Sequence, residues 1–152
     1  MFERTADKLI NVRLYLIKRI LREQDYHKLT SVIVNTFEEL SEKYPASSPA
    51  EHFAVLAVFN DIMYRSEEIT DMHQYRKRFT GNRVNLLLTM MEEEIMKRQR
   101  SLMLLDSVVE MDTDTKLEIK KPYIVHIDIY TTFLERVIEL YEHMYNKREM
   151  ES

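Results

Sequence analysis

Glycine and proline are scarce in this chain, and their scarcity limits the folds that it can adopt. In 152 residues there is one glycine, Gly81, and the prolines are Pro45, Pro49 and Pro122. Sheet-rich folds need many tight turns, and tight turns depend on glycine and proline. The length suits one domain with a substantial hydrophobic core. We therefore predict an all-α fold, in which residues 1–152 form a single-domain bundle of about five helices with short links.

Charge and cysteine content narrow the classes of function. The net charge of -4 gives no general reason to expect binding to nucleic acid or to an anionic membrane. The chain has no cysteine, which excludes disulfides and thiolate metal sites. Charged residues interrupt the apolar residues near the N-terminus, so we expect neither a signal peptide nor a membrane span. The expected location is cytoplasmic.

Apolar residues recur at helical spacing in five segments. Asp25 is a suitable N-cap for the second segment, and Pro45 ends it. Ser48 and Pro49 suit the start of the third, which Thr80 and Gly81 are expected to close. In order, the predicted helices cover residues 2–22, 26–44, Pro49 to the close at Thr80 and Gly81, 82–109, and 123 onward.

The longest predicted non-helical stretch is the loop near 111–121, "MDTDTKLEIKK". Leu117 and Ile119 alternate there with charged residues, as in a short strand. The next residues, 123–129, are rich in strand-forming types, but apolar residues then recur every three or four positions without a break. We predict helix for this last segment, with strand over 123–129 as the alternative.

One heptapeptide, "FAVLAVF" at 53–59, is apolar on every side of a helix. A helix that is apolar all round is normally central and buried. We therefore predict that 53–59 is the most buried continuous stretch. On that basis Leu56→Asp should unfold the domain, because it would bury an unpaired charge.

Two acidic patches have the residue types of a divalent-metal site. Glu38, Glu39 and Glu42 form E-E-x-x-E, and Glu68 and Asp71 form E-x-x-D. Together they resemble the metal-binding motifs of the MazG-like family of pyrophosphohydrolases. The resemblance implies an all-α, magnesium-dependent nucleoside triphosphate pyrophosphohydrolase in which these five carboxylates hold the metal. Carboxylate oxygens are the protein ligands that magnesium prefers.

Helix geometry predicts instead that the two patches do not meet. The turn between Pro45 and Pro49 is short, so the helices on either side should pack antiparallel. Glu42 then lies beside residues 51–53, and Glu68 lies some fifteen residues further along, about 20 Å away. Ligands of one magnesium ion lie within about 2 Å of it. We therefore predict no metal site and no cofactor.

One cluster combines basic and aromatic residues. Arg76, Lys77, Arg78 and Arg83 lie near Tyr75 and Phe79. Such a cluster is suited to phosphate contact and base stacking, which makes an accessory nucleic-acid-binding protein a further alternative. The simpler interpretation is a helix C-terminus, where cations complement the helix dipole.

The last helix carries three adjacent columns of mostly apolar residues at seven-residue spacing, a face wider than the seam of a simple coiled coil. Two neighbouring helices must cover it, either both from this chain or one from a partner. Because tyrosine hydroxyls favour a partly wet boundary, we predict that Tyr141, Met144 and Tyr145 contribute to an intermolecular contact. The alternative is a purely internal face.

The sequence contains no other recognisable catalytic motif. The five histidines have no ligand spacing, and one glycine cannot form a P-loop, a dinucleotide fingerprint or a nucleophile elbow. We therefore expect a small intracellular adaptor without catalytic activity, with an assembly or regulatory role, that binds a protein partner or forms a homo-oligomer.

Overall fold

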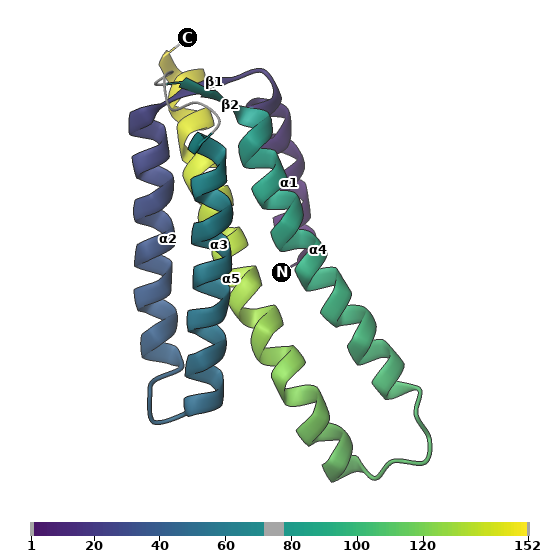
Figure 1. Ribbon diagram of the computed structural model, residues 1–152. Helices are drawn as coiled ribbons and strands as arrows, with labels where there is room; N and C mark the ends of the chain where they lie inside the picture. The colour runs from purple at the N-terminus through teal and green to yellow at the C-terminus, as the bar shows by residue number, and fades with distance from the viewer. Residues whose placement is uncertain (1, 72–77, 152) are drawn as a thin grey trace.

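The computed structural model describes residues 2–71 and 78–151, which form five helices and one small sheet (Figure 1). The helices are α1 (Phe2–Ile17), α2 (Glu23–Lys43), α3 (Pro49–Asp71), α4 (Gly81–Asp106) and α5 (Thr113–Glu151). The strands β1 (Ile20–Arg22) and β2 (Arg78–Thr80) pair antiparallel. The predicted all-α bundle of about five helices is confirmed, and the short sheet is an addition to it.

Helix α5 lies at the centre of the bundle and contacts each of the other four helices. Its middle turns are almost fully enclosed, because side chains on several sides of the helix each find a neighbouring helix. The side chains exposed by 1 % or less are Ile129, Phe133, Leu134, Val137, Ile138 and Tyr141. These residues, together with inward residues of α1 to α4, form one hydrophobic core.

Helix α3 lies at the edge of the bundle, so the prediction that 53–59 is the most buried stretch is wrong. Val55 and Val58 face the core and are 0 % and 2 % exposed, but Phe53 is 71 % exposed and Leu56 is 36 % exposed. Helices α2, α4 and α5 contact α3. They leave its opposite side open, and the central place that we expected for α3 belongs to α5.

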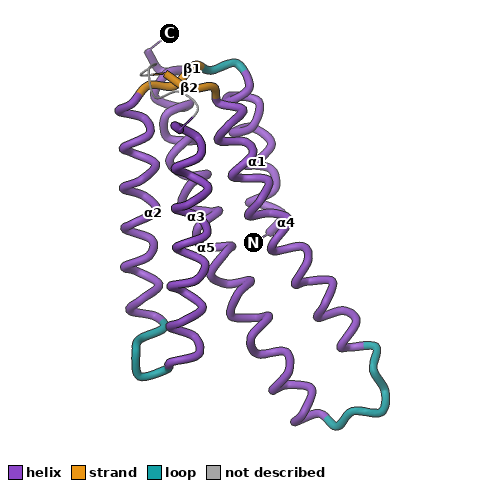
Figure 2. The backbone as a smooth tube through the Cα atoms, in the orientation of Figure 1, coloured by secondary structure: helices purple, strands orange, loops and turns teal. Residues whose placement is uncertain are grey.

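The first helix ends at Ile17, five residues earlier than predicted, because the chain extends into strand β1. The strand register pairs Leu21 with Phe79, and both side chains are 3 % exposed. Ile20 points the other way and is 68 % exposed. The sheet thus joins the start of α2 to the start of α4 at one end of the bundle (Figure 2).

Gly81 begins α4, so the prediction that it closes the third helix is wrong. No described residue has a positive φ, so this glycine is not in the left-handed conformation of a helix C-cap. Its N–H donates a hydrogen bond to the carbonyl oxygen of Arg19 (3.0 Å). An ideal Cβ on Gly81 would lie 1.8 Å from the Leu16 carbonyl oxygen. Glycine is therefore required here by the close approach of two backbones.

The predicted loop near 111–121 is also wrong in extent, because α5 begins at Thr113. Asp112 caps this helix: its carboxylate accepts hydrogen bonds from the backbone N–H and the hydroxyl of Thr115, both at 2.8 Å. Pro122 lies inside the helix. The residues at 123–129 are helical, so the strand alternative for them is excluded.

The hairpins α2–α3 and α4–α5 lie together near the sheet and diverge toward their loops (Figure 1). The core ends at Ile95 on α4 and begins again at Ile129 on α5. All residues between them are described, and none is buried. We call residues 96–128 the arm. This part of the α4–α5 hairpin holds no buried residue, although Val125 and Ile127 still pack against the core.

Candidate protein-interaction surfaces

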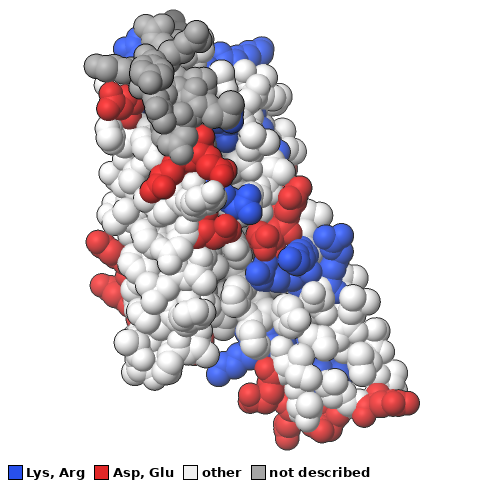
Figure 3. All heavy atoms as spheres, in the orientation of Figure 1, with Lys and Arg blue, Asp and Glu red and all other residues white. Residues whose placement is uncertain are grey.

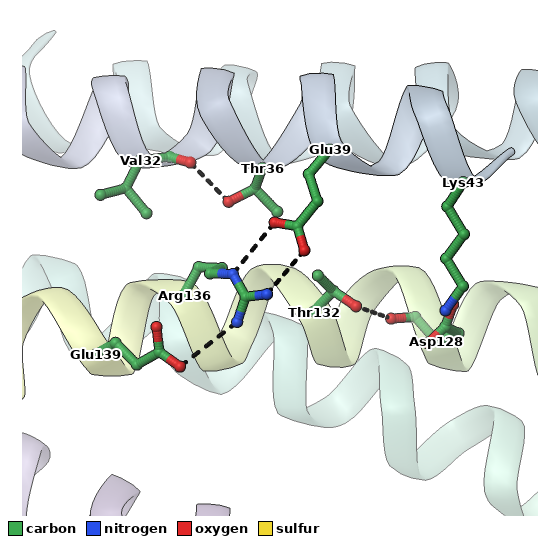
Figure 4. A network of polar contacts seen from close by, with 8 residues as sticks. All are labelled: Val32, Thr36, Glu39, Lys43, Asp128, Thr132, Arg136 and Glu139. Atoms are coloured by element: carbon green, nitrogen blue, oxygen red, sulfur yellow. Dashed lines mark hydrogen bonds and ion pairs between the residues drawn. The ribbon is translucent and has the colours of Figure 1, made fainter. Parts of the chain in front are cut away.

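The first acidic patch belongs to an ion-pair network between α2 and α5 (Figure 4). Arg136 donates two hydrogen bonds to Glu39, from Nη2 to Oε1 at 2.8 Å and from Nε to Oε2 at 3.3 Å. These hydrogen bonds hold the pKa of the Glu39 carboxyl below its usual value. Glu38 and Glu42, on the same helix, are exposed. Glu39 therefore pairs with Arg136 across the contact between α2 and α5.

The second acidic patch faces a different helix. Glu68 lines a depression of about 450 Å³ between α3 and α4, together with Arg65 and Arg83. The side chain of Asp71 lies outside the described residues. Among the side chains that the structure describes, no three histidine, aspartate or glutamate residues gather in a way that could hold a metal ion. Glu39 and Glu68 thus have separate neighbours; that all five carboxylates stay apart remains a prediction.

The basic cluster is described only in part. Arg76 and Lys77, and the side chain of Arg78, lie outside the described residues. Arg83 lines the same depression as Glu68, and Glu93 and Glu94 line it as well. The depression therefore carries both signs of charge, and the described part of the cluster is not a purely basic surface.

The predicted interface on the last helix is wrong for Tyr141. Tyr141 is 0 % exposed, so it offers no surface to a partner. Tyr145 is 37 % exposed and packs edge-on against Tyr15 of α1, with ring centroids 5.6 Å apart. Met144 is partly buried against the core. Helix α1 therefore covers part of this face, and an intermolecular role for Met144 and Tyr145 stays a prediction.

The Tyr141 hydroxyl is buried in the core and has no hydrogen-bond partner among the described residues. Burial raises the pKa of this phenol, and the nearby Asp25 adds to the effect. A buried phenol without a partner costs stability, so the ring must be retained for its packing.

The exposed side of α3 forms an uncharged surface that we call the outer face of α3. Its members follow helical spacing and are all exposed: Phe53, Leu56, Ala57, Asn60 and Tyr64. Phe53 is 71 % exposed and Tyr64 is 64 % exposed. Between Pro49 and Tyr64 the only charged residues are Glu51 and Asp61. Figure 3 shows an uncharged area over the lower part of α3.

A shallow groove lies next to this face, between the start of α3 and the arm. It has a volume of about 270 Å³, and its apolar lining includes Ala50, Ala54 and Val125. Glu51 and Lys121 also line the groove and form an ion pair across it at 3.4 Å. Glu118 lines the groove as well, so the groove joins the outer face of α3 to α5 through a lining of apolar and charged residues.

The arm carries a second set of exposed apolar side chains. Val109 is 93 % exposed, Met103 is 71 % exposed and Leu104 is 70 % exposed. The other exposed apolar residues of the arm are Met96, Val108, Leu117, Ile119 and Ile124. Single exposed apolar residues are ordinary in proteins, whereas the arm carries eight on one hairpin.

The density of methionine in residues 89–105 is a sequence signal for the exposed apolar residues of the arm, because methionine is favoured on adaptable binding surfaces. The outer face of α3 was missed, because an all-round apolar helix is normally buried. The signal that could have found it is the polar second half of the same helix, which is typical of a helix at the edge of a bundle.

No family model, curated protein or solved structure matches this chain. Among the described residues, no helix combines the length and apolar character that crossing a membrane requires.

Proposed function

We propose that this protein acts by binding another protein, as a small assembly or regulatory adaptor, with the outer face of α3 as the contact surface. The observation that carries the proposal is the exposed half of "FAVLAVF". Its inner side packs in the core through Val55 and Val58, while Phe53 and Leu56 lie at the surface. The bundle covers only one side of this apolar helix. The uncovered side is therefore suited to contact with a partner protein.

The composition of the outer face supports this proposal. Aromatic residues are enriched at protein interfaces and charged residues are depleted at interface centres. The outer face carries the aromatic residues Phe53 and Tyr64 and no charged residue. Burying one large apolar side chain contributes about 1.5–3 kcal/mol, so the exposed phenylalanine is the strongest single anchor on this face.

The adjoining groove supports a helical partner. An amphipathic helix binds a groove through apolar side chains at intervals of three and four residues. Ala50 and Ala54 line the groove with small side chains, which leave room for a partner's side chains. Phe53 lies on the same helix, next to Ala54 in the sequence. The Glu51–Lys121 ion pair lies among the lining residues, where its charges can pair with polar residues that flank the apolar face of the partner helix.

The test compares two surface variants as baits in an extract of the source cells. The first is Phe53→Asp with Tyr64→Asp, on the outer face of α3. The matched control is Ser31→Asp with Asn35→Asp on the exposed side of α2, which adds the same charge. Wild type and control should retain the same discrete protein, and the α3 variant should lose it by at least about tenfold. Equal retention by all three baits would contradict the proposal.

A further inference from the structure

The charges of the arm follow a block order along α4. Residues 92–94 are three glutamates, and the charged residues from 95 to 105 are Lys97, Arg98 and Arg100, all basic. The next charged residues are all acidic: Asp106, Glu110, Asp112 and Asp114. We call residues 106–114 the acidic tip. Asp106 pairs with Lys120 of the same arm and Asp112 caps α5, so Glu110 and Asp114 are the tip carboxylates that form neither an ion pair nor a helix cap with the described residues. On the face shown in Figure 3, basic side chains lie over the middle of the arm and acidic ones at its free end.

One exposed face of α4 joins the basic block to the apolar residues. Positions 96, 97, 100, 103 and 104 follow helical spacing and are all exposed. Lys97 and Arg100 form no ion pair with another described residue, whereas Arg98 pairs with Glu94 and lies over the Tyr130 ring. We call the five positions the arm face. Its two cationic groups are therefore available to a partner.

The basic residues of the arm face and the acidic tip carry opposite charges, and they lie on either side of Met103 and Leu104. Lys97 lies six and a half positions before the midpoint between Met103 and Leu104, about 10 Å along α4, and the acidic tip lies beyond it, at the end of α4 and in the loop that follows. A twofold axis through this midpoint places the basic block of one copy opposite the acidic tip of the other. A parallel pairing would place like charges together. Closed twofold dimers are the commonest symmetric assembly, and their interfaces are self-complementary.

From this arrangement we infer that the arm is a homodimerisation element, in which two copies pair antiparallel about Met103 and Leu104. The apolar side chains at the axis are buried between the copies, and Lys97 and Arg100 of each copy pair with the acidic tip of the other. This surface lies on α4 and is separate from the outer face of α3. A contact centred on one helix face is small, below about 1,200 Å² in total, so dimerisation depends on protein concentration.

Charge reversal gives a decisive test, because the two halves of the contact can be reversed separately. Lys97→Glu with Arg100→Glu makes the arm face acidic like the tip, and Glu110→Lys with Asp114→Lys places two lysines in the tip beside the ion-paired Asp106 and the capping Asp112. Each variant alone should be monomeric, with a dimerisation constant weakened by at least about tenfold. An equal mixture of the two should form a heterodimer, because opposite charges then meet in both halves. Sedimentation velocity measures all of these masses.

Two further variants complete the experiment. Lys18→Glu with Lys28→Glu reverses two exposed cations outside the arm and should dimerise as the wild type does. Met103→Gln with Leu104→Gln should be monomeric while its melting temperature stays near that of the wild type, since both side chains are about 70 % exposed. A wild type that stays monomeric at high concentration overturns the inference. So does a mixture of the reversed variants that stays monomeric, or a reversed variant that dimerises normally.

Discussion

Gly81 and Leu16 meet backbone to backbone: a Cβ atom on Gly81 would lie 1.8 Å from the Leu16 carbonyl oxygen. The Gly81 N–H also donates to the carbonyl of Arg19. The single glycine of the chain thus stands where the end of α1 meets the start of α4.

Gly81→Ala should lower the free energy of unfolding by at least about 2 kcal/mol. The atoms that a methyl group would meet are backbone atoms of Leu16, which cannot rotate away. Urea denaturation measures the effect. Asn82→Ala, at the next and exposed position, is the control and should stay within about 0.5 kcal/mol of the wild type. Equal stability of the two variants would show that the backbones do not approach this closely.

Tyr141→Phe should be neutral or should raise the free energy of unfolding, by up to about 1 kcal/mol. The substitution keeps the buried ring and removes a hydroxyl that has no partner among the described residues. Tyr44→Phe is the contrasting variant, because the Tyr44 hydroxyl donates to Asp128 at 2.6 Å. It should lose about 1 kcal/mol. A larger loss from Tyr141→Phe than from Tyr44→Phe would contradict this account.

Alkaline pH should destabilise the fold through buried tyrosines. Burial raises the pKa of Tyr130 to about 12, with Glu94 adding to the effect, and it also raises the pKa of Tyr141. A raised tyrosine pKa leaves stability intact below the unfolded value near 10. Stability is then lost between about pH 10 and 12, by up to about 1.4 kcal/mol per pH unit for each tyrosine. Urea melts across this range should show the loss, and Tyr141→Phe should make its slope shallower.

The two sides of α3 should respond differently to charge. Ile62→Asp should unfold the domain, because Ile62 is 0 % exposed and the carboxylate would have no partner. Phe53→Asp should change the free energy of unfolding by about 0.5 kcal/mol or less, since Phe53 is 71 % exposed. Leu56→Asp, which the sequence predicted to unfold the domain, should resemble Phe53→Asp. Thermal melts distinguish these outcomes, and a collapse of Phe53→Asp would place the outer face inside the core.

The Glu39–Arg136 pair should contribute little to stability. Both side chains are more than one third exposed to solvent, at 52 % and 35 %, and exposed pairs contribute about 0.2–1 kcal/mol. Because the Glu39 pKa is lowered by Arg136, this contribution is present above the ordinary carboxyl pKa near 4.5 and is lost as pH falls below it. A double-mutant cycle with Glu39→Gln and Arg136→Gln, at pH 7 and pH 3, measures it. A coupling energy that persists at pH 3 would contradict this interpretation.

The helices were predictable because their apolar residues recur at helical spacing, and Pro45 and Pro49 bound the turn between α2 and α3. The start of α5 was not predicted, since the alternation of Leu117 and Ile119 with charges fits an exposed helix as well as a strand. The Asp112 cap favours the helix, because its carboxylate accepts two hydrogen bonds from Thr115 in the first turn. Strand β1 was missed because Ile20 and Leu21 continue the helical pattern of the first segment, and only pairing with residues 78–80 makes them extended.

The surfaces depend on which helix is central, and the sequence does not settle that choice. Residues 53–59 and the middle of α5 are both strongly apolar, but α5 packs against all four other helices. Once α5 occupies the centre, the exposed half of α3 follows. The same arrangement places Tyr141 in the core and leaves Met103 and Leu104 on the arm.

The most direct test of the central proposal is site-specific photocrosslinking in the source cells. A benzophenone side chain in place of Phe53 samples the outer face of α3, and the same group in place of Asn35 samples the exposed side of α2. The account predicts a discrete crosslinked protein from position 53 and none from position 35. No crosslink from position 53, or the same products from both positions, would contradict it.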